Sequence, residues 1–290
     1  MILGTLETLV RQHFEPLQYA AFFGALAACL LAEALTAPAA DRRRRARWPA
    51  NWALTAVNVM LTGALPLSVI AAGDFALVRG WGLLNQPWVP PLAALATGFL
   101  LRSAASYAIH VAMHKLPVLW RIHRVHHTDR AMDVSTTVRF HPLEFAISLP
   151  LLVALALMLG IPPLALLLYE LFDAVMAVFT HADIRLPARV ERALRLVLVT
   201  PAMHRIHHSA WQPETDSNYG ATFSIWDRLC GTFRTRPYRE VAALRLGLDE
   251  WQDARTNSFA WLLRLPFSSG HHRSRGTAAR VVSQSERSSA

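Results

Sequence analysis

The chain has 290 residues, of which 53% are hydrophobic and 17% are charged, and its mean hydropathy is +0.26. Soluble domains usually carry about 25% charged residues, so this composition indicates a membrane protein. The 29 basic and 20 acidic side chains leave a net charge of +9. Because no nucleic-acid-binding module accompanies that charge, we expect contact with anionic lipid headgroups and no nucleic-acid partner.

Five apolar stretches follow one another along the chain. The first three, at about 17–40, 52–72 and 89–112, can each span roughly 30 Å of hydrocarbon as a helix. The fourth and fifth lie between Phe145 and Thr180 and are separated by Gly160-Ile161-Pro162-Pro163. They are short, and they predict a helical hairpin that crosses the membrane and returns. The two prolines suit the first turn of the returning helix, where no backbone donor is lost.

The positions of the arginines predict the orientation. Arg42 to Arg45 and Arg47 directly follow the first span, so this loop should be cytoplasmic. The loop 73–88 is then outside, and residues 114–141 and everything after His181 are inside. Residues 268–290 are rich in Ser and Arg and have no apolar period, which predicts a disordered tail.

Ten of the 13 histidines lie between His110 and His208, most of them in short motifs. His110 and His114 are four residues apart, so they share one helix face. Two HxxHH motifs follow, and His141 and His181 stand singly at the mouths of the hairpin helices. The two HxxHH motifs consist of His123, His126 and His127, and of His204, His207 and His208.

This histidine pattern is typical of a metal centre. In each HxxHH motif we expect the first two histidines to share a face, while the third, turned by about 100°, reaches a neighbouring ion. Imidazole suits Fe, Zn, Cu and Ni. Ten ring nitrogens would give about five per ion, more than a single tetrahedral zinc requires, so two metals are predicted.

The residues also exclude several kinds of chemistry and leave two alternatives open. The HxxxH motif reads His110-Val-Ala-Met-His114 and lacks the Glu of the HExxH metalloprotease motif. No GxSxG motif, P-loop or nucleotide-binding glycine fingerprint is present, so electrons would come from a partner protein. A zinc-dependent membrane hydrolase remains an alternative, as does a non-redox metal-binding membrane protein. Transport is disfavoured because the motifs follow the spans and do not interrupt them.

The motifs and their flanks resemble the fatty acid hydroxylase superfamily, also called the sterol desaturase family. The resemblance covers about Arg102 to Arg236, and the order and spacing of the boxes are specific. One departure is Asp183, which stands where the family usually has Asn. The matching segments are the tryptophan-led box 119–127, the R-x-HPLE segment 139–144, the F-x-H segment 179–183, the last histidine box 200–209, and the closing segments 218–220 and 226–233.

The resemblance implies an all-α polytopic membrane protein with four to five transmembrane or re-entrant helices and a cytoplasmic helical cap carrying the metals. It implies a non-haem di-iron centre that uses O2 and two electrons, from a ferredoxin- or cytochrome-type donor, to hydroxylate or desaturate a lipid. It divides the chain into membrane spans at 1–95, a histidine-box domain at 96–240 containing the hairpin 145–181, a C-terminal extension at 241–267 and the tail.

By position, the implied metal ligands are His110, His114, His123, His126, His127, His181, His204, His207 and His208. His141 is carried over as well, either as a ligand or as a supporting or capping group. The candidate acceptors that would orient the imidazoles are Asp173, Asp183, Asp216, Asn218 and Asp227. The sequence does not choose among fatty acids, sterols and other lipids as the substrate.

Overall fold

A computed structural model describes residues 2–36 and 45–268 of the chain. It is helical, and the described residues contain only two isolated β-bridges, Leu198–Phe223 and Ser209–Leu246. Five apolar helical segments are long enough to cross a membrane, at 14–36, 48–79, 91–115, 142–159 and 163–181. These agree with the five stretches expected from the sequence. The predicted tail at 268–290 and the arginines at 42–44 lie almost entirely outside the described residues.

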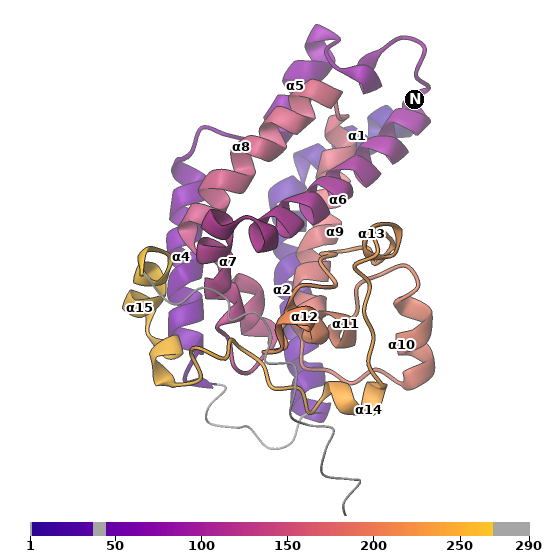
Figure 1. Ribbon diagram of the computed structural model, residues 1–290. Helices are drawn as coiled ribbons and strands as arrows, with labels where there is room; N and C mark the ends of the chain where they lie inside the picture. The colour runs from indigo at the N-terminus through magenta and orange to yellow at the C-terminus, as the bar shows by residue number, and fades with distance from the viewer. Residues whose placement is uncertain (1, 37–44, 269–290) are drawn as a thin grey trace, which may run out of the picture.

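A bundle that contains the long helices runs from one end of the molecule to the other, and a cap of shorter helices is gathered at one end beside it (Figure 1). The bundle, which we call the long-helix bundle, consists of α1 (Ile2–Gln12), α2 (Phe14–Thr36), α4 (Trp48–Ala64), α5 (Val69–Arg79), α6 (Pro91–Lys115), α8 (Pro142–Leu159) and α9 (Pro163–His181). The cap consists of α7 (Pro117–His127), α10 (Ala188–Leu194), α11 (Pro201–His207), α12 (Gln212–Thr215), α13 (Ile225–Leu229), α14 (Tyr238–Val241) and α15 (Phe259–Arg264). The described residues also contain four 3-10 turns: η1 (Leu83–Asn85), η2 (Val134–Val138), η3 (Ala254–Asn257) and η4 (Leu265–Phe267).

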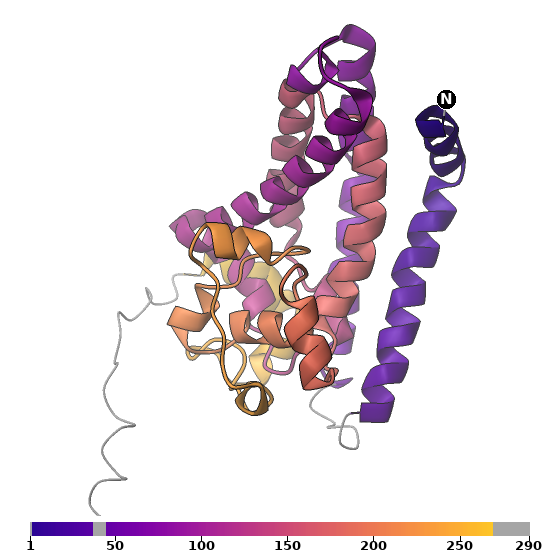
Figure 2. The same ribbon diagram turned by 90° about the vertical axis from the view of Figure 1, so that its right-hand side faces the viewer.

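Helix α9 is the centre of the long-helix bundle. It packs along α2 on one side and against α5 and α6 on others, and α2 runs beside it for most of its length (Figure 2). Its first turns are buried, with Ala165 and Leu166 fully enclosed. Helix α9 therefore provides a fixed axis on which His181, its last residue, is held at the cap.

The hairpin between α8 and α9 turns where the sequence predicted it would. Gly160 ends α8 in the left-handed conformation, with φ of 66°, which glycine adopts without steric penalty. A side chain there would collide with the carbonyl oxygen of Trp81, so this end of the hairpin is closed against the loop before η1. Pro163 begins α9, as expected for a residue that has no amide donor to lose.

The second span is longer than expected and is broken. Residues 52–72 were expected to form one helix followed by a loop at 73–88. Instead α4 ends at Ala64 because Leu65 precedes a proline and is extended, with ψ of 126°. The chain restarts as α5, whose first turn is capped by the Ser68 hydroxyl accepting from the amide of Ala71 at 3.2 Å. Helix α5 then continues to Arg79 through part of the expected loop.

Arg47, one of the arginines expected to face the cytoplasm, is buried. Its guanidinium is 3% exposed and pairs with the carboxylates of Asp129 and Asp133, which are equally buried. Arg139, fully enclosed nearby, donates to the carbonyl of Val125 at 3.0 Å and to Asn51 at 2.7 Å. These contacts fix the start of α4 against the segment that follows α7.

Candidate metal centre

Nine histidines from four parts of the chain converge where the long helices meet the cap. Their ring nitrogens form two groups, and within each group the atoms lie within 4.8 Å of one another. The first group contains His110, His114, His123, His127 and His207, and the second contains His126, His181, His204 and His208. The groups adjoin, since the rings of His127 and His208 are stacked with centroids 4.6 Å apart.

The nitrogens that face one another are the Nε2 atoms. In the first group, His110 Nε2 lies 3.1 Å from His123 Nε2 and 3.1 Å from His207 Nε2. In the second group, His181 Nε2 lies 3.2 Å from His126 Nε2 and 3.0 Å from His204 Nε2. Each group is thus a small shell of nitrogens directed at a common point.

The HxxHH motifs divide between the groups differently from the sequence expectation. We expected the first and second histidines of each motif to act together. The structure instead brings together the first and third, His123 with His127 and His204 with His208, while the second joins the other group. On a helix, four residues advance by about 40° beyond a full turn, whereas three fall about 60° short of one. The i,i+4 pair therefore points at one centre, and each motif bridges both groups.

The outer nitrogens of six histidines are held by acceptors. Backbone carbonyls hold four of them: His110 Nδ1 lies 2.7 Å from Tyr219 O, His207 Nδ1 2.7 Å from Ser217 O, His181 Nδ1 2.8 Å from Ala177 O and His126 Nδ1 3.3 Å from Arg139 O. Carboxylates hold two more: His123 Nδ1 lies 2.9 Å from Glu144 and His114 Nδ1 3.4 Å from Asp216. These partners fix the orientation of each ring.

The same contacts fix which nitrogen carries the proton. A carbonyl oxygen can only accept, so the Nδ1 atoms of His110 and His207 must donate, and in neutral rings both Nε2 atoms are then bare lone pairs. Those two Nε2 atoms are nevertheless 3.1 Å apart. The same holds for His126 and His181, at 3.2 Å. Buried lone pairs at this separation repel each other unless a cation lies between them, so the donor set fits metal ions.

Burial keeps the imidazoles neutral. Desolvation, followed by the neighbouring imidazoles, lowers the pKa of His126, His127, His204 and His208 well below 6.5. The pKa of His207 falls to about 3, again mainly through burial. Neutral imidazole is the form that binds metals, so these rings need lose no proton near neutral pH.

His141 lies in neither group. Its Nδ1 accepts from the amide of Leu143 at 3.2 Å, so it caps α8, and its Nε2 lies 3.2 Å from the carbonyl of Leu263. Since the carbonyl only accepts, Nε2 carries the proton, and both ring nitrogens are engaged by backbone atoms. This places His141 in the capping position that the sequence left open as one of its roles.

Of the five candidate acceptors, Asp216 contacts a histidine, at the Nδ1 atom of His114. Asp173 accepts from Tyr169 at 3.3 Å, and Asp183 pairs with Arg205 at 3.2 Å. Asn218 and Asp227 stabilise the loop whose carbonyls contact His110 and His207, through hydrogen bonds with backbone and hydroxyl groups of that region. Asp227 accepts from the amides of Tyr219 and Gly220 at 2.7 and 2.9 Å.

Asn218 explains the shape of that loop. It has φ of 52°, a left-handed conformation that Asn tolerates better than most residues. Its side-chain amide donates to the carbonyls of Met203 and Arg234, and its oxygen accepts from the amide of Arg234 at 2.8 Å. The loop is thereby tied to α11, which supplies the last histidine motif.

Glu144 is the residue that sequence reasoning missed as a partner of an imidazole. The sequence placed it at the start of α8, within the R-x-HPLE segment, but did not connect it with His123. The spacing to His123 is 21 residues, so no helical period relates the two. The available signal was a carboxylate three residues after His141, in the part of the chain that carries the histidine motifs.

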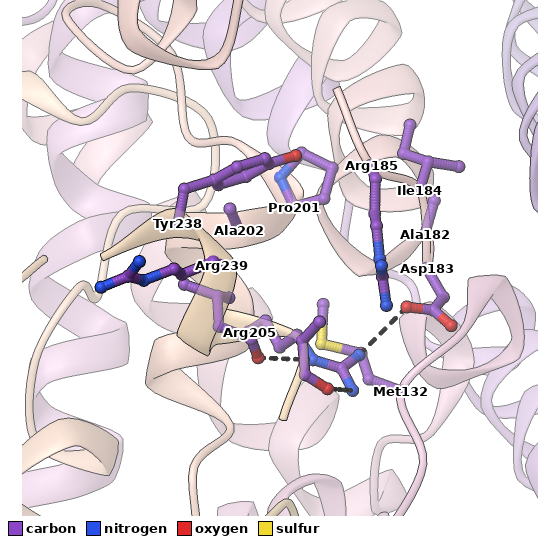
Figure 3. A pocket seen from close by; sticks show the side chains of 12 residues that line it. Met132, Ala182, Asp183, Ile184, Arg185, Pro201, Ala202, Arg205, Tyr238 and Arg239 are labelled. Carbon is purple, nitrogen blue, oxygen red and sulfur yellow. Dashed lines mark hydrogen bonds and ion pairs between the residues drawn. The ribbon is translucent and has the colours of Figure 1, made fainter. Parts of the chain in front are cut away.

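A pocket of about 130 Å³ lies in the cap behind the second group. Figure 3 shows Arg205 at one side of it, joined to Asp183, with Tyr238 and Arg185 on other sides. The guanidinium of Arg205 also donates to the carbonyls of Val241 and Ala242. Ala182 and Arg205, which line the pocket, directly follow His181 and His204 in sequence, but none of the nine histidines lines the pocket itself.

Comparison with known proteins gives a consistent picture. Residues 95–232 match the family model described as fatty acid hydroxylase. The chain is 29% identical over 192 residues to ornithine lipid hydroxylase OlsE of Rhizobium tropici, covering 65% of this chain and 57% of that protein. It is 27% identical over 196 residues to human alkylglycerol monooxygenase, covering 66% and 43%, and 26% identical over 174 residues to mouse lathosterol oxidase, covering 60% and 56%.

The chain therefore spans about half the length of these curated relatives. No solved structure was found to match it. The family match begins within α6 and ends just after α13, so it encloses all nine converging histidines.

Proposed function

We propose that this chain, whose residues 95–232 match the fatty acid hydroxylase family model, is a membrane-bound oxidoreductase that uses O2 to hydroxylate or desaturate a C–H bond of a lipid. The observation that carries this proposal is the pair of adjoining groups of buried imidazoles whose bare Nε2 atoms face one another.

We assign the nine converging histidines as ligands of two non-haem irons, five nitrogens at one and four at the other. Imidazole is a good ligand for iron, and five or four nitrogens leave coordination positions open on an octahedral ion. When bound, the irons would supply the redox chemistry that activates O2. The family match supports this assignment, since the matched residues contain every one of these histidines.

The chain's own residues would hold the centre in place and keep it dry. The carbonyls of Tyr219 and Ser217 and the carboxylate of Glu144 fix three rings of the first group. Eight of the nine histidines are at most 5% exposed in the described structure, and they include every member of the second group. Exclusion of water protects a reactive oxidant from side reactions.

The same proposal specifies the route of the substrate, the source of electrons and the orientation in the membrane. The lipid substrate would enter from the bilayer, and electrons would come from a ferredoxin- or cytochrome-type partner protein. We place the histidine groups on the cytoplasmic face, as the arginine distribution predicts. We retain 96–240 as the catalytic domain, with residues 1–95 as membrane spans and 241–267 as an extension that packs on α7 and α4.

The names of the relatives indicate a lipid substrate but differ in the kind of lipid. Their names refer to an ornithine lipid, an alkylglycerol and a sterol. We would therefore supply 1-O-alkylglycerol, ornithine lipid and sterol to the reconstituted protein, with a reducing system, and seek O2-dependent products by mass spectrometry. Product formation that continues without O2 would favour a hydrolase.

Metal content is the direct test of the centre. We expect elemental analysis of detergent-purified protein from iron-replete cells to give near two irons per chain. His127→Ala should lower that content, whereas His141→Ala, the matched control outside both groups, should retain it. One zinc and no iron, unchanged after iron reconstitution, would contradict the di-iron assignment. Loss of metal in His141→Ala would make His141 a ligand.

A further inference from the structure

Four large apolar side chains are exposed on two neighbouring segments of the cap. Leu196 and Val197 follow α10 and are 64% and 57% exposed, while Ile225 and Leu229 of α13 are 44% and 70% exposed. The segments are joined side by side: the amide of Ser224 donates to the carbonyl of Val197 at 2.9 Å. These four side chains therefore form one surface, which we call the cap ridge.

The cap ridge is attached to the middle of two long helices. Trp226 of α13 donates from its indole nitrogen to the hydroxyl of Ser103 in α6 at 2.9 Å. Phe223, just before α13, packs on Phe99 of α6 and Phe172 of α9, with ring centroids 6.1 and 5.4 Å apart. In both views α13 lies at the edge of the cap turned toward the far ends of the long helices (Figures 1 and 2).

Exposed apolar side chains also lie on the two long helices near the point where the cap ridge is attached. Leu100 follows Phe99 on α6 and is 47% exposed, and Val175 is within one turn of Phe172 on α9 and is 38% exposed. Both helices are apolar enough to cross a membrane, so these side chains would face acyl chains. The cap ridge is therefore anchored on helices that would themselves contact lipid.

Arginines flank the cap ridge. Arg192 and Arg195 precede Leu196, and Arg228 lies between Ile225 and Leu229. The guanidinium of Arg228 lies 3.8 Å from the ring centroid of Phe233 and donates to the carbonyl of Arg195 at 2.8 Å. The two acidic residues nearby, Glu191 and Asp227, are buried and accept hydrogen bonds from within the cap. Exposed charge beside the ridge is therefore cationic.

We propose that the cap ridge is a bilayer-binding surface, inserted at the boundary between headgroups and acyl chains, with the flanking arginines on lipid phosphates. An apolar face bordered by arginines is the pattern of segments that lie in the membrane interface. The ridge segment is attached to two of the membrane-length helices, so one membrane can contact both. Binding of the cap ridge would keep the cap in contact with the leaflet from which a lipid would approach the histidine groups.

Depth-dependent fluorescence quenching tests this proposal. A single reactive thiol would be placed at Leu229→Cys or Leu196→Cys in a Cys230→Ser background, where Cys29 is buried. The matched control is Glu240→Cys in α14, which is exposed at the opposite edge of the cap (Figure 1). Each variant, labelled with an environment-sensitive dye, is reconstituted in phosphatidylcholine–phosphatidylglycerol vesicles that contain lipids spin-labelled on the acyl chain.

We expect blue-shifted emission and several-fold stronger quenching at both ridge positions than at position 240. Ridge labels that emit and are quenched like the control would overturn the proposal. So would protection of the ridge by a second copy of the chain, seen as quenching that depends on protein-to-lipid ratio. The readout needs neither metal nor turnover, so its failure and failure of the di-iron assignment are separate results.

Discussion

The two histidine groups use the same kind of ligand but have different outer partners. In the first group, carboxylates contact two rings, Glu144 at His123 and Asp216 at His114. In the second group, no carboxylate contacts a ring within the described residues; backbone carbonyls lie behind His126 and His181, and the Thr180 hydroxyl also lies 3.4 Å from His181 Nδ1. The Nδ1 atoms of His204 and His208 have no hydrogen-bond partner within the described part of the chain.

This difference bears on how the two metals would behave. A carboxylate behind an imidazole raises its basicity and compensates part of the metal charge, whereas a carbonyl does so less. We therefore expect the first group to bind its metal more tightly and the second to be the more electron-poor site. Two sites of one ligand type can in this way be made unequal by residues that never touch a metal.

The largest expected effect is the loss of one site. His126→Ala removes one of only four nitrogens from the second group. We expect iron to fall from two to one per chain and O2-dependent product to fall to background, as measured by elemental analysis and mass spectrometry. Comparison of detergent gel-filtration profiles would establish that the variant still inserts and folds. Turnover at the wild-type rate would show that His126 is not a ligand.

Removing the carboxylate should make the two groups more alike. Chelator titration of the wild-type protein should release metal in two steps, with the second group emptying first. In Glu144→Gln the first group should lose about 10–100-fold in affinity, the usual effect of changing the partner of a ligand. The two steps would then merge.

Glu170→Gln provides the matched control for that titration, because Glu170 pairs with Arg102 and contacts no imidazole. It should keep two separate steps. A two-step release that survives in Glu144→Gln would show that the carboxylate does not cause the inequality.

A smaller effect is expected for a residue that holds the loop behind a histidine and does not contact the histidine itself. Asp227→Asn weakens the hydrogen bonds that hold the amides of Tyr219 and Gly220, and through them the carbonyl behind His110. Hydrogen bonds to a buried charged group contribute about 2 kcal/mol, so we expect a lower Tm and weaker metal binding at the first group only. Asp249→Asn, at an exposed position, should change neither.

The last effect is absent at neutral pH and concerns the metal-free protein at acidic pH. His207 has a pKa of about 3 in the folded chain and near 6.5 when unfolded. Between these values the unfolded chain binds more protons, so the free energy of unfolding falls as pH is lowered through this window and is constant above it. His208 shares the lowered pKa, so His208→Gln should reduce the slope by up to about 1.4 kcal/mol per pH unit. Chemical denaturation at several pH values measures this, and an unchanged slope would contradict it.

Sequence reasoning found the histidines because their spacing is local. The spacings in HxxxH and HxxHH match the helical period, and imidazole is a common metal ligand, so the two together indicated a metal site. The same reasoning divided each HxxHH motif incorrectly, because i+3 and i+4 both count as neighbours on a helix and only the packing of α7 against α6 and α11 selects between them. Pairings across the chain, such as Glu144 with His123 or Ser217 with His207, follow no period and had to come from the structure.

For the fold as well, features set by local sequence were predicted and others were missed. The five apolar stretches and the hairpin at Gly160 were predicted because length, hydropathy and proline position determine them. The break before Ser68 and the continuation to Arg79 were missed, since Pro66 stands within an otherwise apolar run. Asp173 was one of the candidate acceptors for the histidines, but in the structure it accepts from Tyr169, one turn earlier on α9.

The burial of Arg47 has a consequence for how the protein is made. In the orientation proposed above, a basic residue after the first span helps to keep that loop on the cytoplasmic side during insertion. In the finished molecule the same guanidinium neutralises Asp129 and Asp133 inside the cap. A chain inserted in the opposite orientation would have to assemble the cap on the other side of the membrane. Removal of Arg47 would leave two buried carboxylates without their cation, which is strongly destabilising. If the loop is inserted as proposed, one side chain therefore serves both the orientation of the first span and the assembly of the cap.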